Sequence, residues 1–407
     1  MKKISILLVF ILLLSCKKKT EEKREDINFA NWSSIEKQAT GKDITMVMWM
    51  GDAKINAYMR NYIIPKVKKE NNINLQIIDG QGSKVVQLLM TEQQANKSNS
   101  DIDLMWINGE TFYQLKQING LYGPWTDKLP NAKNIDFKNP FIGTDFQQQI
   151  DGFELPWGNV QMAWIYNSDK VKNPPQTRAE LLLFVKQNPG IFTFDNQFTG
   201  LTFLKSLLID ISGSKDNLSG DFNSKKYKEY STELWQYINE LRPYLWRKGT
   251  VFPENVAQVH QLFSNGELWF TMSNNDAEVD SKIAEGLFPN STMAYVPEFG
   301  TIQNSHYIGI SSNSANKAAA MVVANALISV EAQSKKMNPI IWGDGTVLDL
   351  NKLSKKDKSI FEQIPARIKS PKRNDIQNKA LKELAPEYMV KLAEDFRKYV
   401  INNQAQN

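Results

Sequence analysis

Hydrophobic and polar positions follow one another along the chain in blocks that predict strands followed by helices. Short apolar runs at residues 44–49, 73–78 and 101–107 have the length and residue types of buried strands. Each run leads into glycine or polar residues and then into apolar residues at helical spacing. Pro65 should perturb the second half of the first of these helices. Three strand-then-helix units in series predict a mostly parallel, doubly wound sheet.

A second block of the same kind follows a loop-rich stretch. Strands are predicted near residues 191–194, 268–272 and 292–296, with helices near residues 200–211, 225–241 and 254–265. Apolar segments at residues 160–166 and 306–311 flank this block and would carry the chain out to it and back. No linker rich in Gly, Pro or Ser separates the two blocks. The pattern therefore predicts two doubly wound αβ lobes joined by crossover strands, with a ligand cleft between them.

The N-terminus has the pattern of a lipoprotein signal peptide. A start with two lysines precedes the apolar stretch from Ile4 to Leu14, which is too short to span a bilayer. The stretch ends at Ser15 and Cys16, and this ending resembles the bacterial lipobox. That resemblance implies that Cys16 is acylated and becomes the mature N-terminus. A buried cysteine that happens to follow a signal peptide is the alternative, and the charged segment behind Cys16 favours acylation.

These patterns divide the chain into four parts. We expect a signal peptide at residues 1–15, a lipidated disordered tether at 16–41, a first lobe formed by 42–159 and 305–407, and a second lobe at 160–304. Within the first lobe, residues 315–330 form an Ala-rich helix and the remainder reads as helical and charged.

Composition narrows the function classes. The 407 residues are 42% hydrophobic, which is enough for one or two ordinary domains. The formal charge is +5, and part of this excess lies near the N-terminus, so no dense basic stripe remains to bind nucleic acid. One cysteine and two histidines exclude an internal disulfide and metal centres built from Cys or His. We expect no metal ion and no other cofactor.

An ordered series of segments resembles the YnjB-type branch of the solute-binding lipoproteins of ABC transporters. The segments are residues 49–52, 103–110, 121–124, 156–158, 251–253, 300–306, 318–327 and 342–350. The resemblance covers about residues 44–355, and nothing beyond about residue 351 matches the pattern of the family. It implies a type II periplasmic-binding-protein-like α/β fold and a monomer that is not an enzyme. It further implies an extracytoplasmic, lipid-anchored protein that hands a small solute to ABC permease subunits served by an ATPase.

Polar residues at the carboxyl ends of the predicted strands are the first candidates for solute binding, because helix N-termini there present unpaired amide groups. They are Gly51, Asp52, Ser83, Asn108, Glu110, Thr199, Ser273 and Asn274. Five of them, Asp52, Ser83, Asn108, Thr199 and Ser273, are equally good helix N-caps, which stabilise a helix by about 0.5–2 kcal/mol without any ligand. Their convergence on one cleft favours a binding site, and the scarcity of cations among them predicts a small polar solute, neutral or positively charged.

Aromatic residues complete the candidate set. Trp49 and Trp157 could stack on a planar solute, and His306 opens the returning connection. Burial in the core explains Trp157 equally well, and a structural role explains His306 equally well.

Two other functions stay open. A surface hydrolase could use a pair of carboxylates, although the chain lacks a Gly-x-Ser-x-Gly motif and we expect no catalytic residue. A lipoprotein that binds a partner without any transport function is the second. Saturable binding without turnover would separate the solute-binding role from the hydrolase.

Overall fold

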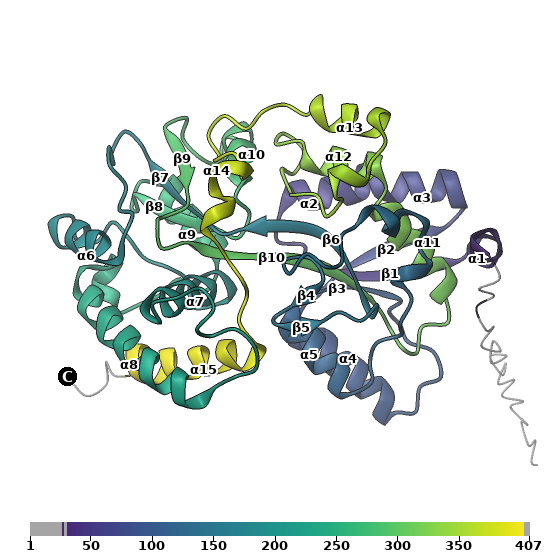
Figure 1. Ribbon diagram of the computed structural model, residues 1–407, viewed down its shortest axis with the longest axis horizontal. Coiled ribbons are helices and arrows are strands. Elements are labelled where there is room, and N and C mark those ends of the chain that lie inside the picture. Colours follow the sequence, from purple (N-terminus) through teal and green to yellow (C-terminus); the bar gives the residue numbers. More distant parts are fainter. Residues whose placement is uncertain (1–26, 28–30, 403–407) are drawn as a thin grey trace, which may run out of the picture.

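The computed structural model describes residue 27 and residues 31–402, so the predicted lipidation site Cys16 lies outside the described residues. A six-stranded sheet organises the first lobe, in the order β11-β10-β3-β1-β2 with β6 also paired to β10 (Figure 1). Its strands are β1 (Asp43–Met48), β2 (Asn74–Asp79), β3 (Leu104–Ile107), β6 (Glu154–Gln161), β10 (Thr301–Ile310) and β11 (Ala380–Leu381). Strand β1 runs parallel to β2 and β3, as predicted, whereas β10 runs antiparallel to β3 and β6.

Helices cover this sheet on both faces, as the alternating pattern predicts. They are α2 (Ala53–Tyr58), α3 (Ile64–Asn71), α4 (Ser83–Gln94), α5 (Gly109–Gln117), α11 (Lys317–Leu327), α12 (Val330–Met337) and α13 (Lys355–Glu362). A π-helical turn, η1 (Met59–Ile63), joins α2 to α3 just before Pro65. Proline lacks the amide hydrogen that would continue the regular helical pattern, so the expected disturbance takes the form of a wider turn on its N-terminal side.

The second lobe is built on an antiparallel sheet of three strands in the order β8-β7-β9, so the doubly wound arrangement expected for this lobe is wrong, although its mixed αβ character is as expected. The strands are β7 (Ala163–Asn167), β8 (Phe270–Ser273) and β9 (Thr292–Tyr295), and the helices are α6 (Arg178–Gln187), α7 (Phe198–Ile211), α8 (Ser224–Leu241), α9 (Val256–Ser264) and α10 (Glu278–Ala284). The strand predicted at residues 191–194 is wrong. Phe192 and Phe194 are buried and both pack against Phe203, but the segment pairs with no strand: the backbone oxygens of Ile191 and Phe192 accept hydrogen bonds from two separate segments, at Trp269 and Trp246.

Strands β6 and β10 lie side by side and run between the two lobes (Figure 1). Their pairing extends from Gln161 opposite Gln303 to Glu154 opposite Gly309. Strand β10 begins five residues before the predicted start of the returning connection. The returning strand is therefore where it was predicted, but the outgoing strand lies earlier than predicted, because β6 makes the crossing and residues 163–166 already belong to β7 of the second lobe. A short hairpin of β4 (Thr144–Asp145) and β5 (Gln148–Gln149) lies beside the two crossing strands (Figure 1).

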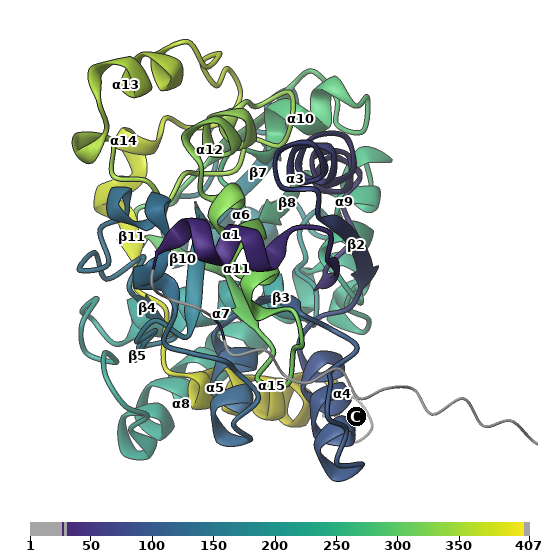
Figure 2. The same cartoon turned by 90° about the vertical axis from the view of Figure 1, so that its right-hand side faces the viewer.

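Both ends of the chain depart from the predicted division. Residues 32–39, expected in a disordered tether, form helix α1 (Trp32–Ala39), which Asn31 caps and which packs on α11 (Figure 2). Its apolar residues Ile35 and Ala39 are buried. This short apolar stripe in an otherwise polar segment therefore packs the helix against the first lobe.

The C-terminal segment, expected in the first lobe, leaves α13, passes through α14 (Arg373–Ile376) and ends in α15 (Pro386–Phe396) on the second lobe. The buried side chains Leu392 and Phe396 belong to the same core as Phe194 of that lobe. The amphipathic face of α15 thus finds its apolar partner in α7 of the second lobe.

Candidate functional site

Two helices of the first lobe begin at residues that the sequence singled out. Asp52 caps α2 by accepting hydrogen bonds from the backbone N–H groups of Lys54 and Ile55, and Asn108 caps α5 through Thr111. Ser83 does not cap a helix: α4 begins at Ser83 itself, after Gly82. Gly82 has a φ of 54°, which a glycine adopts freely, and the Ser83 side chain is exposed. The capping role is therefore confirmed for Asp52 and Asn108 and wrong for Ser83.

Asp52 also contacts the second lobe. Its Oδ2 lies 2.5 Å from Nζ of Lys282 on α10, and both side chains are about nine-tenths buried, with 11% and 8% exposed. Nζ of Lys282 also forms ion pairs with two carboxylates of its own lobe, Oε1 of Glu278 at 3.7 Å and Oε2 of Glu285 at 3.3 Å. Burial opposes ionisation of Asp52, but the charge of Lys282 and the hydrogen bonds that Asp52 accepts together outweigh it, so the pKa of Asp52 lies below its ordinary value. Sequence reasoning missed Lys282, which lies 230 positions away.

Two predicted residues of the second lobe contact each other. Asn274, just after β8, donates a hydrogen bond from Nδ2 to Oγ1 of Thr199 at 2.9 Å. Thr199 is the second residue of α7, whose N-cap is Gln197, so Thr199 is not a cap. Ser273 ends β8 and accepts a hydrogen bond from the backbone N–H of Asn275 at 2.9 Å, so it shapes the turn and caps no helix. The expected grouping of Thr199 with Asn274 is present.

Trp49, Gly51 and Glu110 lie close to these helix ends. A Cβ on Gly51 would lie 2.4 Å from the indole ring of Trp49, so only glycine fits beneath that ring. Glu110 is in the first turn of α5 and accepts one long hydrogen bond, from Gln114 at 3.4 Å. Burial raises the pKa of the Glu110 carboxyl, and the charge of Lys205 on α7 opposes this shift.

An aromatic cluster surrounds Trp157 on the crossover strand β6. Its ring centroid lies 5.1 Å from that of Trp106 and 5.3 Å from that of Trp342, both at steep angles. His306 on β10 lies 6.1 Å from Trp157 and is stacked on Trp342 with an angle of 8° between the planes. Trp157 is 0% exposed, and within the described residues its Nε1–H has no acceptor.

A buried ionic group underlies the aromatic cluster. Asp344 accepts from Lys336 through one oxygen and lies 3.0 Å from Nε2 of His306 through the other. Burial opposes the charge on Asp344, but His306 and Lys336 lower the pKa of its carboxyl below the ordinary value. Gly158 makes this arrangement possible, because a Cβ there would lie 2.3 Å from both Asp344 Oδ2 and the His306 ring. His306 is thus fixed by its hydrogen bond to Asp344 and its stacking on Trp342, as expected if its role is structural.

A second ionic group ties the C-terminal segment to the second lobe. Asp276, fully buried after β8, pairs with Arg367 and, at 2.8 Å, with Arg373. Arg373 also donates to the backbone oxygen of Asn159 on β6 at 2.9 Å. Burial opposes ionisation of Asp276, but the two arginines bring its pKa below the ordinary value. The sequence offered one clue to this group: Arg367 and Arg373 are two of only three arginines after residue 355, in a segment otherwise rich in lysine.

Comparisons of the sequence with protein families and with proteins of known sequence both indicate the role of this protein. A family model described as bacterial extracellular solute-binding protein matches residues 62–356. Protein YnjB of Escherichia coli (strain K12) is 37% identical over 328 residues, which cover 80% of this chain and 84% of that protein.

The chain belongs to the bacterial extracellular solute-binding protein family.

Solved structures agree with the fold expected of this solute-binding protein. An ABC transporter structure from Clostridium perfringens has a TM-score of 0.59 at 15% identity and covers 88% of this chain and 99% of its own. The spermidine/putrescine substrate-binding protein PotD of Streptococcus pneumoniae has a TM-score of 0.58 at 14% identity, with coverages of 88% and 99%. AfuA of Actinobacillus pleuropneumoniae, with fructose-6-phosphate bound, has a TM-score of 0.59 at 13% identity, with coverages of 90% and 98%. The type II periplasmic-binding-protein-like fold and the family resemblance are both confirmed.

Membership also fixes the general role and location of this solute-binding protein. Proteins of the family bind solutes outside the cytoplasm and are not enzymes. Among residues 31–402, no helix is both long and apolar enough to cross a membrane. In the same range, no three or more His, Asp or Glu side chains are grouped so as to hold a metal ion.

Proposed function

We propose that this protein is the solute-receiving component of an ABC importer, anchored to a bacterial membrane through lipid on Cys16. It captures a small polar solute between its lobes and, as a monomer, delivers the solute to permease subunits served by an ATPase. Family membership supports the solute-binding role. Similar folds that are titled as ABC transporter components support the transport role.

The observation that carries this proposal is the ion pair between Asp52 and Lys282. It joins the N-terminus of α2 in the first lobe to α10 in the second, at a position where sequence reasoning expects solute contacts. Strands β6 and β10 connect the same lobes and can act as the hinge. A solute that contacts both lobes at once can do so only when the lobes are closed. Its binding therefore shifts the population toward the closed form.

The charge of the solute can be inferred from the carboxylates of the proposed site that have no protein cation beside them. Lys282 already compensates Asp52, so Asp52 does not attract a cationic solute as strongly as the sequence alone suggested. Glu110 has no cation within ion-pair distance in the described part of the chain, and burial raises its pKa. A positively charged group beside Glu110 would restore its ionised form. We therefore propose a small polar solute, neutral or with one positive group, that is bound by Glu110, Asn108, Thr199 and Asn274 and covered by Trp49 or His306. Trp157 is fully buried in the core of the first lobe, so we leave it out of this site.

A panel of small polar metabolites, screened by thermal shift, tests this function. A solute present at 100 times its dissociation constant adds about 2.7 kcal/mol to the stability of the folded protein. The expected hit also binds saturably in calorimetry, is recovered unchanged, and reduces the radius of gyration in small-angle scattering. Conversion of the hit to a product would support the hydrolase instead, and a screen with no hit in any chemical class would contradict solute capture.

Glu110→Gln tests the chemical class, with exposed Glu362→Gln as the matched control. We expect Glu110→Gln to weaken binding of a cationic hit at least tenfold and Glu362→Gln to leave it unchanged. Equal affinities in the two variants would exclude Glu110 from the site.

A further inference from the structure

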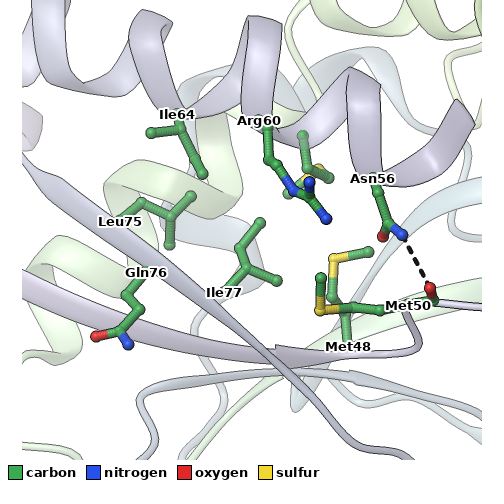
Figure 3. Close-up of a pocket in the computed structure, with 9 residues that line it drawn as sticks. Met48, Met50, Asn56, Arg60, Ile64, Leu75, Gln76 and Ile77 are labelled. Atoms are coloured by element: carbon green, nitrogen blue, oxygen red, sulfur yellow. Dashed lines mark hydrogen bonds between the residues drawn. The ribbon is translucent and has the colours of Figure 1, made fainter. Parts of the chain in front are cut away.

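The first lobe contacts the second at a few separate places. The cavity between α2, η1 and α3 on one side and β1 and β2 on the other is not one of them, because every residue that lines it belongs to the first lobe (Figure 3). The ion pair of Asp52 with Lys282 is one such contact. The β4–β5 hairpin makes another, and it joins the lobes through several side chains at once.

The base of this hairpin belongs to the first lobe, whereas its tip packs in the second. The hydroxyl of Tyr307 donates to the backbone oxygen of Thr144 at 2.9 Å, and Ile150, which follows β5, is buried in the first-lobe core with Tyr307. At the tip, Phe146 is 1% exposed and belongs to the same core as Leu204 of α7. Two residues only four positions apart therefore lie in the cores of different lobes.

The tip has both charged and polar partners in the second lobe. Nζ of Lys205 on α7 lies 4.5 Å from the centre of the Phe146 ring, and this lysine is fully buried and paired with Glu383 at 2.6 Å. A buried cation interacts more strongly with an aromatic ring than an exposed one does. Gln147 donates from Nε2 to the backbone oxygen of Glu383 at 2.5 Å and accepts from the backbone N–H of Gly220 at 3.2 Å.

The same ring also packs on the first lobe. A Cβ on Gly109 would lie 2.0 Å from Cδ2 of Phe146, so the ring lies directly on the first turn of α5, where Glu110 of the proposed solute site follows. Gln148 donates to the backbone oxygen of Gly109 at 3.4 Å and so stays within the first lobe. Phe146 is thus enclosed between α5 of one lobe and Lys205 of the other.

The two residues at the tip have a backbone conformation that L side chains disfavour. The angle φ is 46° at Phe146 and 63° at Gln147, in the left-handed region. Two-residue hairpin turns of this kind favour asparagine and glycine, and a bulky residue there is strained. Such strain persists only where surrounding contacts hold it. Here the contacts come from both lobes, so they hold the strained turn only while the lobes are together.

We propose that the β4–β5 hairpin is a latch between the lobes. With the lobes together, Phe146 and Gln147 fasten the start of α5 to α7 and to the segment around Glu383. When the lobes separate, the base stays with the first lobe, the tip loses its second-lobe partners and the strained turn relaxes. The latch thereby sets how often the solute-free protein opens. This inference rests on the proposed function only in taking the lobes to move.

Two adjacent glutamines allow a matched test of the latch. Gln147→Ala removes both hydrogen bonds to the second lobe, whereas Gln148→Ala removes one bond within the first lobe. Spin labels on cysteines placed at exposed Gln117 of α5 and exposed Lys228 of α8, in a Cys16→Ala background, report the distance between the lobes. Without solute, Gln147→Ala should increase the long-distance fraction at least threefold, and Gln148→Ala should leave it unchanged.

Phe146→Leu is a second variant, which keeps an apolar side chain at the tip and removes the ring beneath Lys205. It should also increase the long-distance fraction at least threefold while the protein still melts cooperatively. Amide hydrogens of residues 144–149 should exchange at least threefold faster in both tip variants than in Gln148→Ala. No solute is added, so the outcome does not depend on whether the protein transports one. Equal long-distance fractions in Gln147→Ala and Gln148→Ala, or an unchanged fraction in Phe146→Leu, would overturn the proposal.

Discussion

Asp52 caps helix α2 of the first lobe and at the same time forms an ion pair with Lys282 of the second lobe, at 2.5 Å. One oxygen, Oδ1, accepts the two backbone N–H groups of the helix, and the other, Oδ2, accepts from the ammonium group. Sequence reasoning weighed a helix cap against a solute contact for Asp52; the structure shows the cap together with an unpredicted ion pair, each carried by a different oxygen of one carboxylate. Substitution at Lys282 separates them, since it leaves the cap in place.

Lys282→Met is expected to favour separation of the lobes. The change leaves Asp52 as a largely buried carboxylate with its two helix N–H donors but no cation, which should cost about 1–3 kcal/mol of stability. Small-angle scattering of the solute-free protein should then give a larger radius of gyration. Urea denaturation measures the stability. Lys84→Met removes a lysine from the exposed start of α4 and is the control. If both variants match the unmodified protein in size and stability, the ion pair does not hold the lobes together.

Gly158→Ala should destabilise the protein by about 1–3 kcal/mol, because the added methyl group has no room. It would lie 2.3 Å from Asp344 and from the His306 ring, both of which belong to the buried ionic group beside Trp157. The denaturation midpoint measures the loss. Combining the change with His306→Ala should recover part of it, since one of the two obstacles is then absent. A double variant in which the two losses simply add would show that the His306 ring is not the obstacle.

Cys16→Ala should release the protein from membranes, because acyl chains on Cys16 would be its anchor. Fractionation of cells followed by immunoblotting is the measurement. Ser15→Ala keeps a small residue before the cysteine and should leave the protein in the membrane fraction. Continued membrane retention of Cys16→Ala would contradict lipidation at this residue.

The sequence predicted those elements whose periodicity is strong and whose partners are near in the chain. Strands β1 to β3 and helices α7 and α8 are examples, because their apolar residues alone specify their faces. Sequence reasoning did not predict the position of an element or a side chain that is fixed by residues far away in the chain. Helix α1 is held by α11, and helix α15 by α7. No local pattern could indicate that Lys282 meets Asp52, or that the C-terminal arginines meet Asp276. At Ser83 the residue type predicted a cap, but Gly82 precedes the helix with a backbone conformation that glycine favours.

Glu154 on β6 carries a prediction about pH. Its side chain is 0% exposed, and within the described residues neither carboxyl oxygen has a hydrogen-bond partner. Burial, followed by the nearby charge of Asp145, raises the pKa of Glu154 well above its ordinary value, and Lys116 opposes this shift only in part. The pKa of Asp145 is itself raised well above its ordinary value, chiefly by burial and next by Glu383, and Tyr307 is the phenol beside both acids.

The folded protein therefore keeps a proton on Glu154 at pH values where the unfolded chain has lost it. The folded state binds more protons than the unfolded state over this range, so stability is greatest below the ordinary pKa of Glu and falls as the pH rises through the raised value. Glu154→Gln replaces the acid with a neutral group of the same shape. The loss of stability with rising pH that Glu154 causes should therefore disappear in this variant. Urea denaturation from pH 5 to pH 8 should show the variant gaining on the unmodified protein by up to about 1.4 kcal/mol per pH unit. Exposed Glu362→Gln should show no such gain, and parallel curves for the two variants would mean that Glu154 is ionised in the folded protein.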